Sequence, residues 1–199
     1  MLLCNISSDK VHIKDEKGEI FLERNGIEKV LWPTLVDWSK KSPFDQVFLL
    51  NGPGGFTNLR VGALTRNLVA HLLDLRQQKV QFFSCTKIDL YRYFVEKGIL
   101  PSIWYIYLWQ KNNVWKYDFV KNSYEIVNQP FVFESESFCD MLWDSSYWGE
   151  NFDMVSFGND ENWLFLLWKW EKKYFSVEDL WLKDVSAVSP EYMIDPTFG

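Results

Sequence analysis

A buried strand that runs directly into a glycine-rich turn and then a long helix is the strongest structural constraint in this sequence. The residues from Val47 to Leu50 are all apolar, which is typical of a strand that is covered on both faces. The next segment, 52–57, reads Gly-Pro-Gly-Gly-Phe-Thr, and a helical apolar pattern follows from Leu59 to Leu75. Glycine allows a sharp reversal of the chain, and the free N–H groups at a helix start attract anions. This order of elements predicts an α/β fold.

Apolar residues elsewhere in the first half repeat with the period of strands and then of a helix. They alternate with polar residues before the first helix, which predicts an antiparallel meander. From Ile27 to Trp38 they recur at helical spacing, and Pro33 fits such a helix only in its first turn or at a kink. Residues 86–89 read Thr-Lys-Ile-Asp, which predicts a capping box. The predicted elements are strands at 1–5, 11–13, 20–22, 47–50 and 80–83 and helices at 27–38, 59–75 and 86–97.

The second half of the chain gives weaker signals. The pair Asn112-Asn113 lies between two apolar segments, and asparagine tolerates the positive φ angles of a tight hairpin turn. Further along, apolar and aromatic residues are dense enough to suit helices that pack on a core. The predicted elements are a hairpin of 102–109 and 114–119, a strand and turn at 153–158, and helices at Glu161–Lys173 and Val177–Leu182.

Aromatic content and charge distinguish the two halves. Aromatic residues make up 18% of the sequence, and most of them follow residue 100, so we expect a ring-rich core there. Residues 1–100 carry a net charge of +3, and residues 101–199 carry −9. We place the boundary between two domains at this point. An acidic half repels phosphate backbones, which argues against broad binding of nucleic acid by this chain alone and favours a basic protein partner.

Few residues could ligate a metal or form a disulfide. Cys4, Cys85 and Cys139 have no CxxC spacing, and only His12 and His71 could add imidazole ligands, which argues against a zinc site and a disulfide framework. The start of the chain lacks the basic region of a signal peptide. The longest strongly apolar run is six residues, against the roughly 20 that a membrane helix needs. We therefore expect a cytoplasmic protein without membrane contact.

The glycine-rich segment fits neither of two common nucleotide-binding loops. A Walker A loop needs Gly-Lys-Ser or Gly-Lys-Thr after the glycines, and none follows here. A GxGxxG dinucleotide loop needs a third glycine at the position of Thr57. A tight turn capped by Thr57 is the simplest interpretation of the glycines alone.

The same segment resembles the signature of one protein family. It reads Gly-Pro-Gly-Gly-Phe-Thr-Asn-Leu-Arg-Val-Gly, which is similar to the GPGSFTGLRIG signature of the TsaB (YeaZ) family of tRNA threonylcarbamoyladenosine (t6A) biosynthesis. Nine of the eleven positions match when Val61 is accepted for isoleucine, and the exceptions are Gly55 and Asn58. The residues that we assign to the signature loop are Gly52, Pro53, Gly54, Gly55, Phe56, Thr57, Arg60 and Gly62.

Three shorter segments resemble the same family, and the sequence resemblance is weaker after residue 100. Segments 3–7, 30–33 and 189–193 resemble the end of its first strand, its first helix and its C-terminal motif. Asn5 stands where the family has an aspartate, the carboxylate that organises metal and water in related actin-like ATPases. Ile194 stands where the family has an arginine. Each departure removes a charge, and neither adds a catalytic group.

The resemblance implies both a fold and a function. The implied fold is α/β, with two ribonuclease-H-like lobes of the actin, Hsp70 and sugar-kinase (ASKHA) architecture and a reduced or divergent second lobe. The implied function is that of a non-catalytic subunit that dimerises with TsaD, which transfers threonylcarbamoyl to adenosine 37 of tRNA. The TsaB family is often grouped with M22 peptidase-like proteins. The resemblance nevertheless implies that this chain is a partner subunit and not itself an enzyme.

The resemblance also implies where cofactors and partners lie. We expect this chain to bind no cofactor alone, because ATP and a metal ion belong to the TsaD partner. TsaE and a second copy of the chain are further candidate partners, and tRNA is contacted only through the complex.

The helix at 59–75 is apolar on two faces, so we expect it to be covered on two sides. The large face consists of Val61, Leu64, Leu68, Leu72 and Leu75, and we expect it to lie on the sheet of its own lobe. The small-residue face allows a partner helix to approach closely, with Arg66 bending outward or selecting a partner carboxylate. The alternative is that helix 27–38 of the same chain covers that face. The residues that we assign to the partner interface are Leu31, Leu35, Gly62, Ala63, Arg66, Val69, Ala70 and Leu73.

Two other classes of function stay open. An actin-like ATPase or kinase would use the 52–57 loop to hold phosphate, although Asn5 and the missing lysine argue against it. A repurposed homodimeric binding module would draw on the divergent, aromatic second half of the chain.

Overall fold

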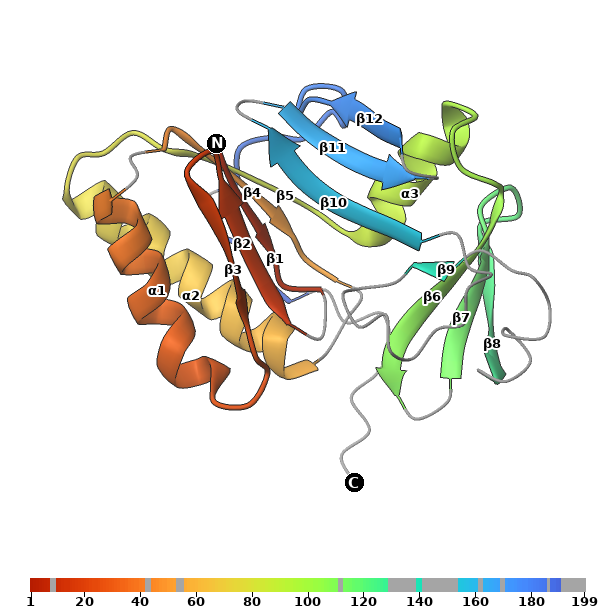
Figure 1. Cartoon of the computed structure of the whole chain (residues 1–199), viewed down its shortest axis with the longest axis horizontal. Coiled ribbons are helices and arrows are strands. Elements are labelled where there is room, and N and C mark those ends of the chain that lie inside the picture. Colours follow the sequence, from red (N-terminus) through yellow and green to blue (C-terminus); the bar gives the residue numbers. More distant parts are fainter. Residues whose placement is uncertain are drawn as a thin grey trace.

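Two β-sheets and three helices make up the part of the chain that the structure, a computed structural model, describes (Figure 1). The described residues are 1–7, 10–41, 44–52, 56–110, 113–128, 139–140, 154–160, 163–168, 171–185 and 187–190. Within them, no helix combines the length and the apolar character that crossing a membrane would require.

The first sheet has the strand order β3-β2-β1-β4-β5. Strands β1 (Leu2–Asn5), β2 (Val11–Asp15) and β3 (Gly18–Leu22) form an antiparallel meander. Strands β4 (Gln46–Leu50) and β5 (Gln81–Cys85) run parallel to β1, with Leu2 opposite Val47 and Val47 opposite Phe82. The meander and the two later strands predicted from the sequence are confirmed.

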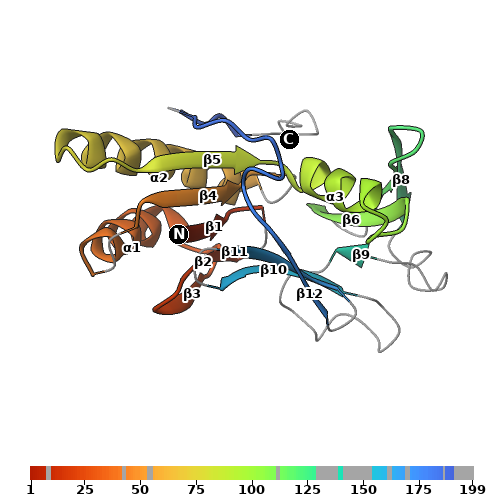
Figure 2. The same ribbon diagram turned by 90° about the horizontal axis from the view of Figure 1, so that it is seen from above.

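Two helices cover one face of this sheet and the third covers the other face (Figures 1 and 2). Helices α1 (Ile27–Lys41) and α2 (Phe56–Leu75) pack on the face that carries Leu2 and Val47, whereas α3 (Lys87–Glu96) packs on the face that carries Leu3 and Phe48. Adjacent residues of a strand point to opposite faces, which explains why the apolar run of β4 has no polar interruptions.

Helix α1 contains a proline, and helix α3 begins with a capping box. Helix α1 runs through Pro33, which lies inside it rather than in its first turn. Helix α3 begins with the predicted capping box, in which the Thr86 hydroxyl accepts from Asp89 N at 3.1 Å and Thr86 N donates to Asp89 Oδ2 at 3.2 Å. This reciprocal pair satisfies N–H groups that a helix start otherwise leaves unbonded.

The second sheet has the order β12-β11-β10-β9-β6-β7-β8. Strands β6, β7 and β8, the first three in the sequence, form an antiparallel meander, and β9 and β10 run parallel to β6. The segment β8-β7-β6-β9-β10 therefore repeats the order and the strand directions of β3-β2-β1-β4-β5. The strands are β6 (Ile103–Gln110), β7 (Asn113–Asp118), β8 (Ser123–Asn128), β9 (Cys139–Asp140), β10 (Met154–Asp160), β11 (Trp163–Trp168) and β12 (Glu171–Phe175).

Two of the predictions for the second half are wrong. The described residues of the segment predicted as a helix at Glu161–Lys173 form β11 and the first part of β12, which pair antiparallel. Residues Val177–Leu182 form turns rather than a helix. In β11, Leu164 and Leu166 face the core while Phe165 on the other face is covered by lysine side chains, so both faces are apolar. A short strand that is covered on both sides has no alternating pattern, and its sequence then looks like a piece of buried helix.

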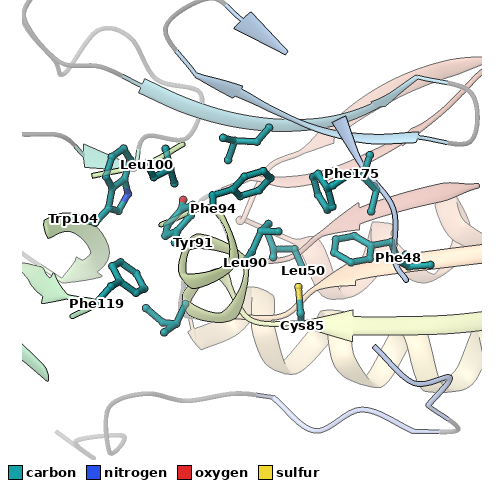
Figure 3. Packing of buried hydrophobic residues seen from close by; sticks show 14 of the residues in the cluster. Phe48, Leu50, Cys85, Leu90, Tyr91, Phe94, Leu100, Trp104, Phe119 and Phe175 are labelled. Atoms are coloured by element: carbon teal, nitrogen blue, oxygen red, sulfur yellow. The ribbon is translucent and has the colours of Figure 1, made fainter. Parts of the chain in front are cut away.

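Helix α3 lies between the two sheets and joins them in one core (Figure 3). Leu90, Tyr91 and Phe94 project from α3. On one side they lie beside Phe48 of the first sheet and Phe175 of β12, and on the other side they face Trp104 of β6. The division of the chain near residue 100 into two domains stays a prediction.

Candidate functional site

The carboxyl ends of β1, β4 and β5 meet at one edge of the first sheet, beside the start of α2. Crevices at this edge of open α/β sheets commonly hold ligands. Asn5 ends β1, and its Oδ1 accepts from Ser7 N at 3.0 Å and from Ser7 Oγ at 2.8 Å. Both residues are buried. The Asn5 side chain therefore holds the bend that the chain makes as it leaves β1.

Asn51 and Gly52 connect β4 to neighbouring segments before the signature loop continues. Asn51 N donates to Cys85 O at 2.8 Å, and Lys87 N donates to Gly52 O at 2.6 Å. Gly52 has φ +90°, in a region that side chains strongly disfavour. The first glycine of the signature is thus required by the backbone conformation.

The rest of the signature lies partly in α2. Pro53, Gly54 and Gly55 lie outside the described residues, and α2 begins at Phe56, three residues before the predicted start. Thr57 is half-buried and Arg60 is exposed.

The last glycine of the signature allows α2 to lie close to the end of the first strand. A Cβ on Gly62 would be 2.5 Å from Ile6 Cγ2 and 2.8 Å from Ile6 Cβ. Non-bonded carbon atoms do not approach so closely, so only glycine fits here.

The polar side chains at this edge include amides, hydroxyls, an amine and the Asp89 carboxylate in the first turn of α3. Asn58 and Lys87 are buried there, at the starts of α2 and α3. Within the described residues, no group of three or more His, Cys, Asp and Glu side chains could hold a metal ion. Cys85, at the end of β5, is buried, and this burial raises the pKa of its thiol, which disfavours the nucleophilic thiolate. The Asp89 carboxylate also raises the pKa of Cys85, and it accepts hydrogen bonds from Thr86 N and Thr86 Oγ1 in the capping box of α3.

The prediction about the faces of α2 is wrong, because the faces are exchanged. The small-residue face packs on the sheet, with Ala63, Val69 and Leu73 buried. The large face points outward, and the exposed fractions of Leu64 and Leu68 are 61% and 45%. The contact between Gly62 and Ile6 decides the orientation, since only the small face lets the helix approach the sheet.

Most of the residues assigned to a partner interface are therefore inside this chain. Leu31 and Leu35 of α1 are buried in the same core as α2, as in the alternative in which the chain covers its own helix. Ala70 is half-buried. The partner interface itself stays a prediction.

Arg66 turns inward rather than outward. Its guanidinium lies 4.2 Å above the ring of Phe82 and donates to Val185 O. Burial lowers the pKa of Arg66 to about 10, and Asp184 acts in the opposite direction. The side chain thus holds the C-terminal segment against the first sheet.

Sequence reasoning missed the residues that fasten this segment. Asn67 accepts from Val188 N and donates to Val188 O, each at 2.9 Å, and Asn51 Nδ2 donates to Ser189 O at 2.7 Å. Ser189 and Pro190 line a hollow of about 600 Å³ together with Thr57 and Arg60. The first two residues of the C-terminal motif therefore meet the signature helix, while Glu191, Tyr192, Met193 and Ile194 lie outside the described residues. Of these residues, Asn51 alone has a sequence context that could have indicated a role, because it lies directly between a buried strand and a glycine.

Comparison with solved structures finds 21 matching chains, of which two are described here. No protein-family model and no curated protein matches this chain. YeaZ from Pseudomonas aeruginosa aligns at 17% identity over 70% of this chain and 74% of its own, with a TM-score of 0.39. An uncharacterized protein with similarity to peptidase YEAZ from Pseudomonas aeruginosa aligns at 14% identity over 97% and 98%, with a TM-score of 0.43. The chain is similar to proteins that carry the family name given by the loop signature. TM-scores below 0.5 transfer neither a fold nor a residue role from them.

Proposed function

We propose that this chain is a non-catalytic TsaB-like subunit that pairs with a TsaD-like enzyme in t6A formation. The observation that carries the proposal is the signature between β4 and α2, because two of its glycines have specific tasks there. Gly52 adopts a left-handed conformation, and Gly62 leaves room for Ile6. A generic glycine-rich turn would need neither a glycine at the seventh residue of the following helix nor the sequence match around it.

The repeated sheet topology supports the ASKHA architecture that we propose for the fold. A meander followed by two strands parallel to its first strand is the ribonuclease-H-like order, and both sheets have it. In the second sheet the hairpin β11–β12 extends the sheet beyond β10. We assign this hairpin to the divergence of the second lobe.

The outward face of α2 is the surface that we propose for the partner. Leu64, Leu68 and Leu75 are exposed on it, and Val30 of the neighbouring α1 is exposed as well. Exposed apolar residues that gather on one face favour a protein contact. The buried small residues of α2 contribute indirectly, because they set the distance between α2 and the sheet and so the position of its outward face.

The polar edge of the first sheet supports a role without catalysis. Asn5 places an amide at the end of β1, where the resemblance implies the carboxylate of actin-like ATPases, and Asn51 places a second amide just after β4. ATP and a metal ion would then act in the TsaD-like partner, and this chain would supply a docking surface. An ATPase or kinase is the competing function.

Co-elution with TsaD tests this proposal. The chain is mixed with the TsaD of its own organism and run on a native size-exclusion column. Wild type should co-elute, Leu64→Arg should not, and Val120→Arg should behave as wild type. Val120 is an exposed apolar residue in the turn after β7, far from α2 in the sequence, and serves as the matched control. Arginine is a good helix former, so Leu64→Arg should stay folded. Separate elution of the wild-type proteins would contradict the proposal, and magnesium-dependent ATP hydrolysis by the isolated chain would favour the enzyme.

A further inference from the structure

The end of the described chain forms a strap over the first sheet. We define the C-terminal strap as residues 182–190, of which residue 186 is not described. Figure 2 shows it in blue, running alongside β5 on the side of α2. Asp184 Oδ1 accepts from Phe82 N at 2.9 Å, and Val185 N donates to Phe82 O at 2.8 Å, so the strap covers part of the free edge of β5.

The body of the protein holds the strap mainly by its backbone. The Asn67 side chain bonds both the N–H and the C=O of Val188, Arg66 donates to Val185 O, and Asn51 donates to Ser189 O. Side chains that bond a peptide backbone recognise an extended segment in the same way whichever molecule supplies it.

Apolar contacts add to this recognition, but the strap bridges its groove rather than filling it. Val185 and Val188 pack partly on the core beside α2, and Leu182 packs partly on the core around α3. Hollows of about 1160 Å³ and about 600 Å³ remain, lined by Val185 and by Val188 respectively. A segment held this way can leave without dismantling either sheet.

A strained residue joins the strap to the rest of the chain. Trp181 has φ +55°, and 91% of it is exposed. A bulky residue in the left-handed region is a conformational outlier, and no burial of the indole compensates for it here. Leu180 and Leu182, on either side, both contact the core, which holds the strained turn in place.

We propose that two copies of this chain exchange their C-terminal straps and form a swapped homodimer with Trp181 as the hinge. In the exchanged dimer, each strap makes the same contacts with Asn51, Arg66 and Asn67 of the other copy. The two forms then differ chiefly at the hinge, where Trp181 can leave the left-handed region. Strained hinges favour domain exchange, which costs little because the contacts are conserved.

This dimer is separate from the contact proposed for TsaD. It uses the groove between α2 and β5, whereas the TsaD contact uses the outward face of α2. Leu64 lines the hollow beside Val188, whereas Leu68, on the outward face of α2, lines neither hollow. Leu68→Arg should therefore affect TsaD co-elution and leave the exchanged dimer unchanged, so the two proposals can fail independently.

Substitutions at the hinge test the exchange. Trp181→Pro excludes positive φ and should favour the dimer. Trp181→Gly removes the strain and should favour the monomer, while Trp181→Ala removes the indole but keeps most of the strain. We measure monomer–dimer dissociation constants by analytical ultracentrifugation over a wide concentration range. Relief of the strain corresponds to a factor of roughly five per hinge, and a dimer has two hinges, so the constants of the glycine and alanine variants should differ by roughly 25-fold.

A second substitution identifies the groove. Adding Asn67→Ala to Trp181→Pro removes both bonds to Val188 and should weaken the dimer, whereas adding Leu68→Arg should not. Equal constants for the glycine and alanine variants would overturn the proposal, as would a folded but monomeric proline variant or a proline dimer that Leu68→Arg dissociates. If the proline variant does not fold, the glycine and alanine comparison decides alone.

Discussion

Replacing Gly62 by alanine should destabilise the protein, although the same change in a helix usually stabilises. The added Cβ would lie 2.5 Å from Ile6 Cγ2, 2.7 Å from Ile6 Cδ1 and 2.8 Å from Ile6 Cβ. A change of rotamer could move the first two atoms but not the third, so α2 or β1 has to shift. Overpacking of a core costs about 1–3 kcal/mol, and we expect the upper end here. The helix propensity of alanine offsets about 1 kcal/mol, which leaves a net loss of about 2 kcal/mol.

Urea denaturation measures this loss, and Gly18→Ala is the control. Nothing lies within 4 Å of a Cβ added at Gly18, so that variant should match or slightly exceed the wild-type free energy of unfolding. For a chain of this size, a loss of about 2 kcal/mol lowers Tm by roughly 4–8 °C. Ile6→Val, which removes Cδ1, should cost less stability in the Gly62→Ala background than in wild type. A Gly62→Ala variant about 1 kcal/mol more stable than wild type would refute the reasoning, because propensity alone would then decide.

Three further predictions concern titration, thiol reactivity and capping. Burial lowers the pKa of His12 below its unfolded value of 6.5, so the unfolded state binds more protons between these two pKa values. The free energy of unfolding should therefore fall as the pH drops below about 6.5, and His12→Gln should flatten this part of a urea-denaturation pH series. Cys4 and Cys85 are buried, and burial raises the pKa of Cys4 to about 12, so in a Cys139→Ser background a thiol reagent should label neither until denaturant is added. Thr86→Ala breaks the capping box of α3 and should cost about 1 kcal/mol in urea, whereas Thr86→Ser should cost little; equal losses would show that the hydroxyl is not the cap.

The sequence predicted the first sheet and its helices because each element there has its own local signal. The capping residues at 86–89 begin a helix whatever surrounds them, and the uninterrupted run in β4 is the mark of two-sided burial. The hairpin β11–β12 had no such signal, since Phe165 on one face is covered by Lys14 of β2 and by Lys172 of β12.

The candidate site was predictable as a loop but not as a surface. The signature located Gly52 and Gly62, and these positions are where the backbone needs glycine. The orientation of α2 depends on a contact with Ile6 that no helical period can reveal, because both of its faces are apolar. The role of Asn67 depends on a partner 121 positions away along the chain.

The position of α3 between the sheets has a consequence for protein synthesis. The helix is complete before residue 100, but Trp104 and Phe175, which cover its outer face, come later in the chain. At 5–20 residues per second, a ribosome needs roughly 5–20 s to translate residues 101–199. During this time Tyr91 and Phe94 on the nascent chain have no apolar cover from the second sheet. Each newly made molecule therefore passes through a stage that presents an aromatic surface to chaperones, and a ribosome that stalls near residue 100 would release an aggregation-prone fragment.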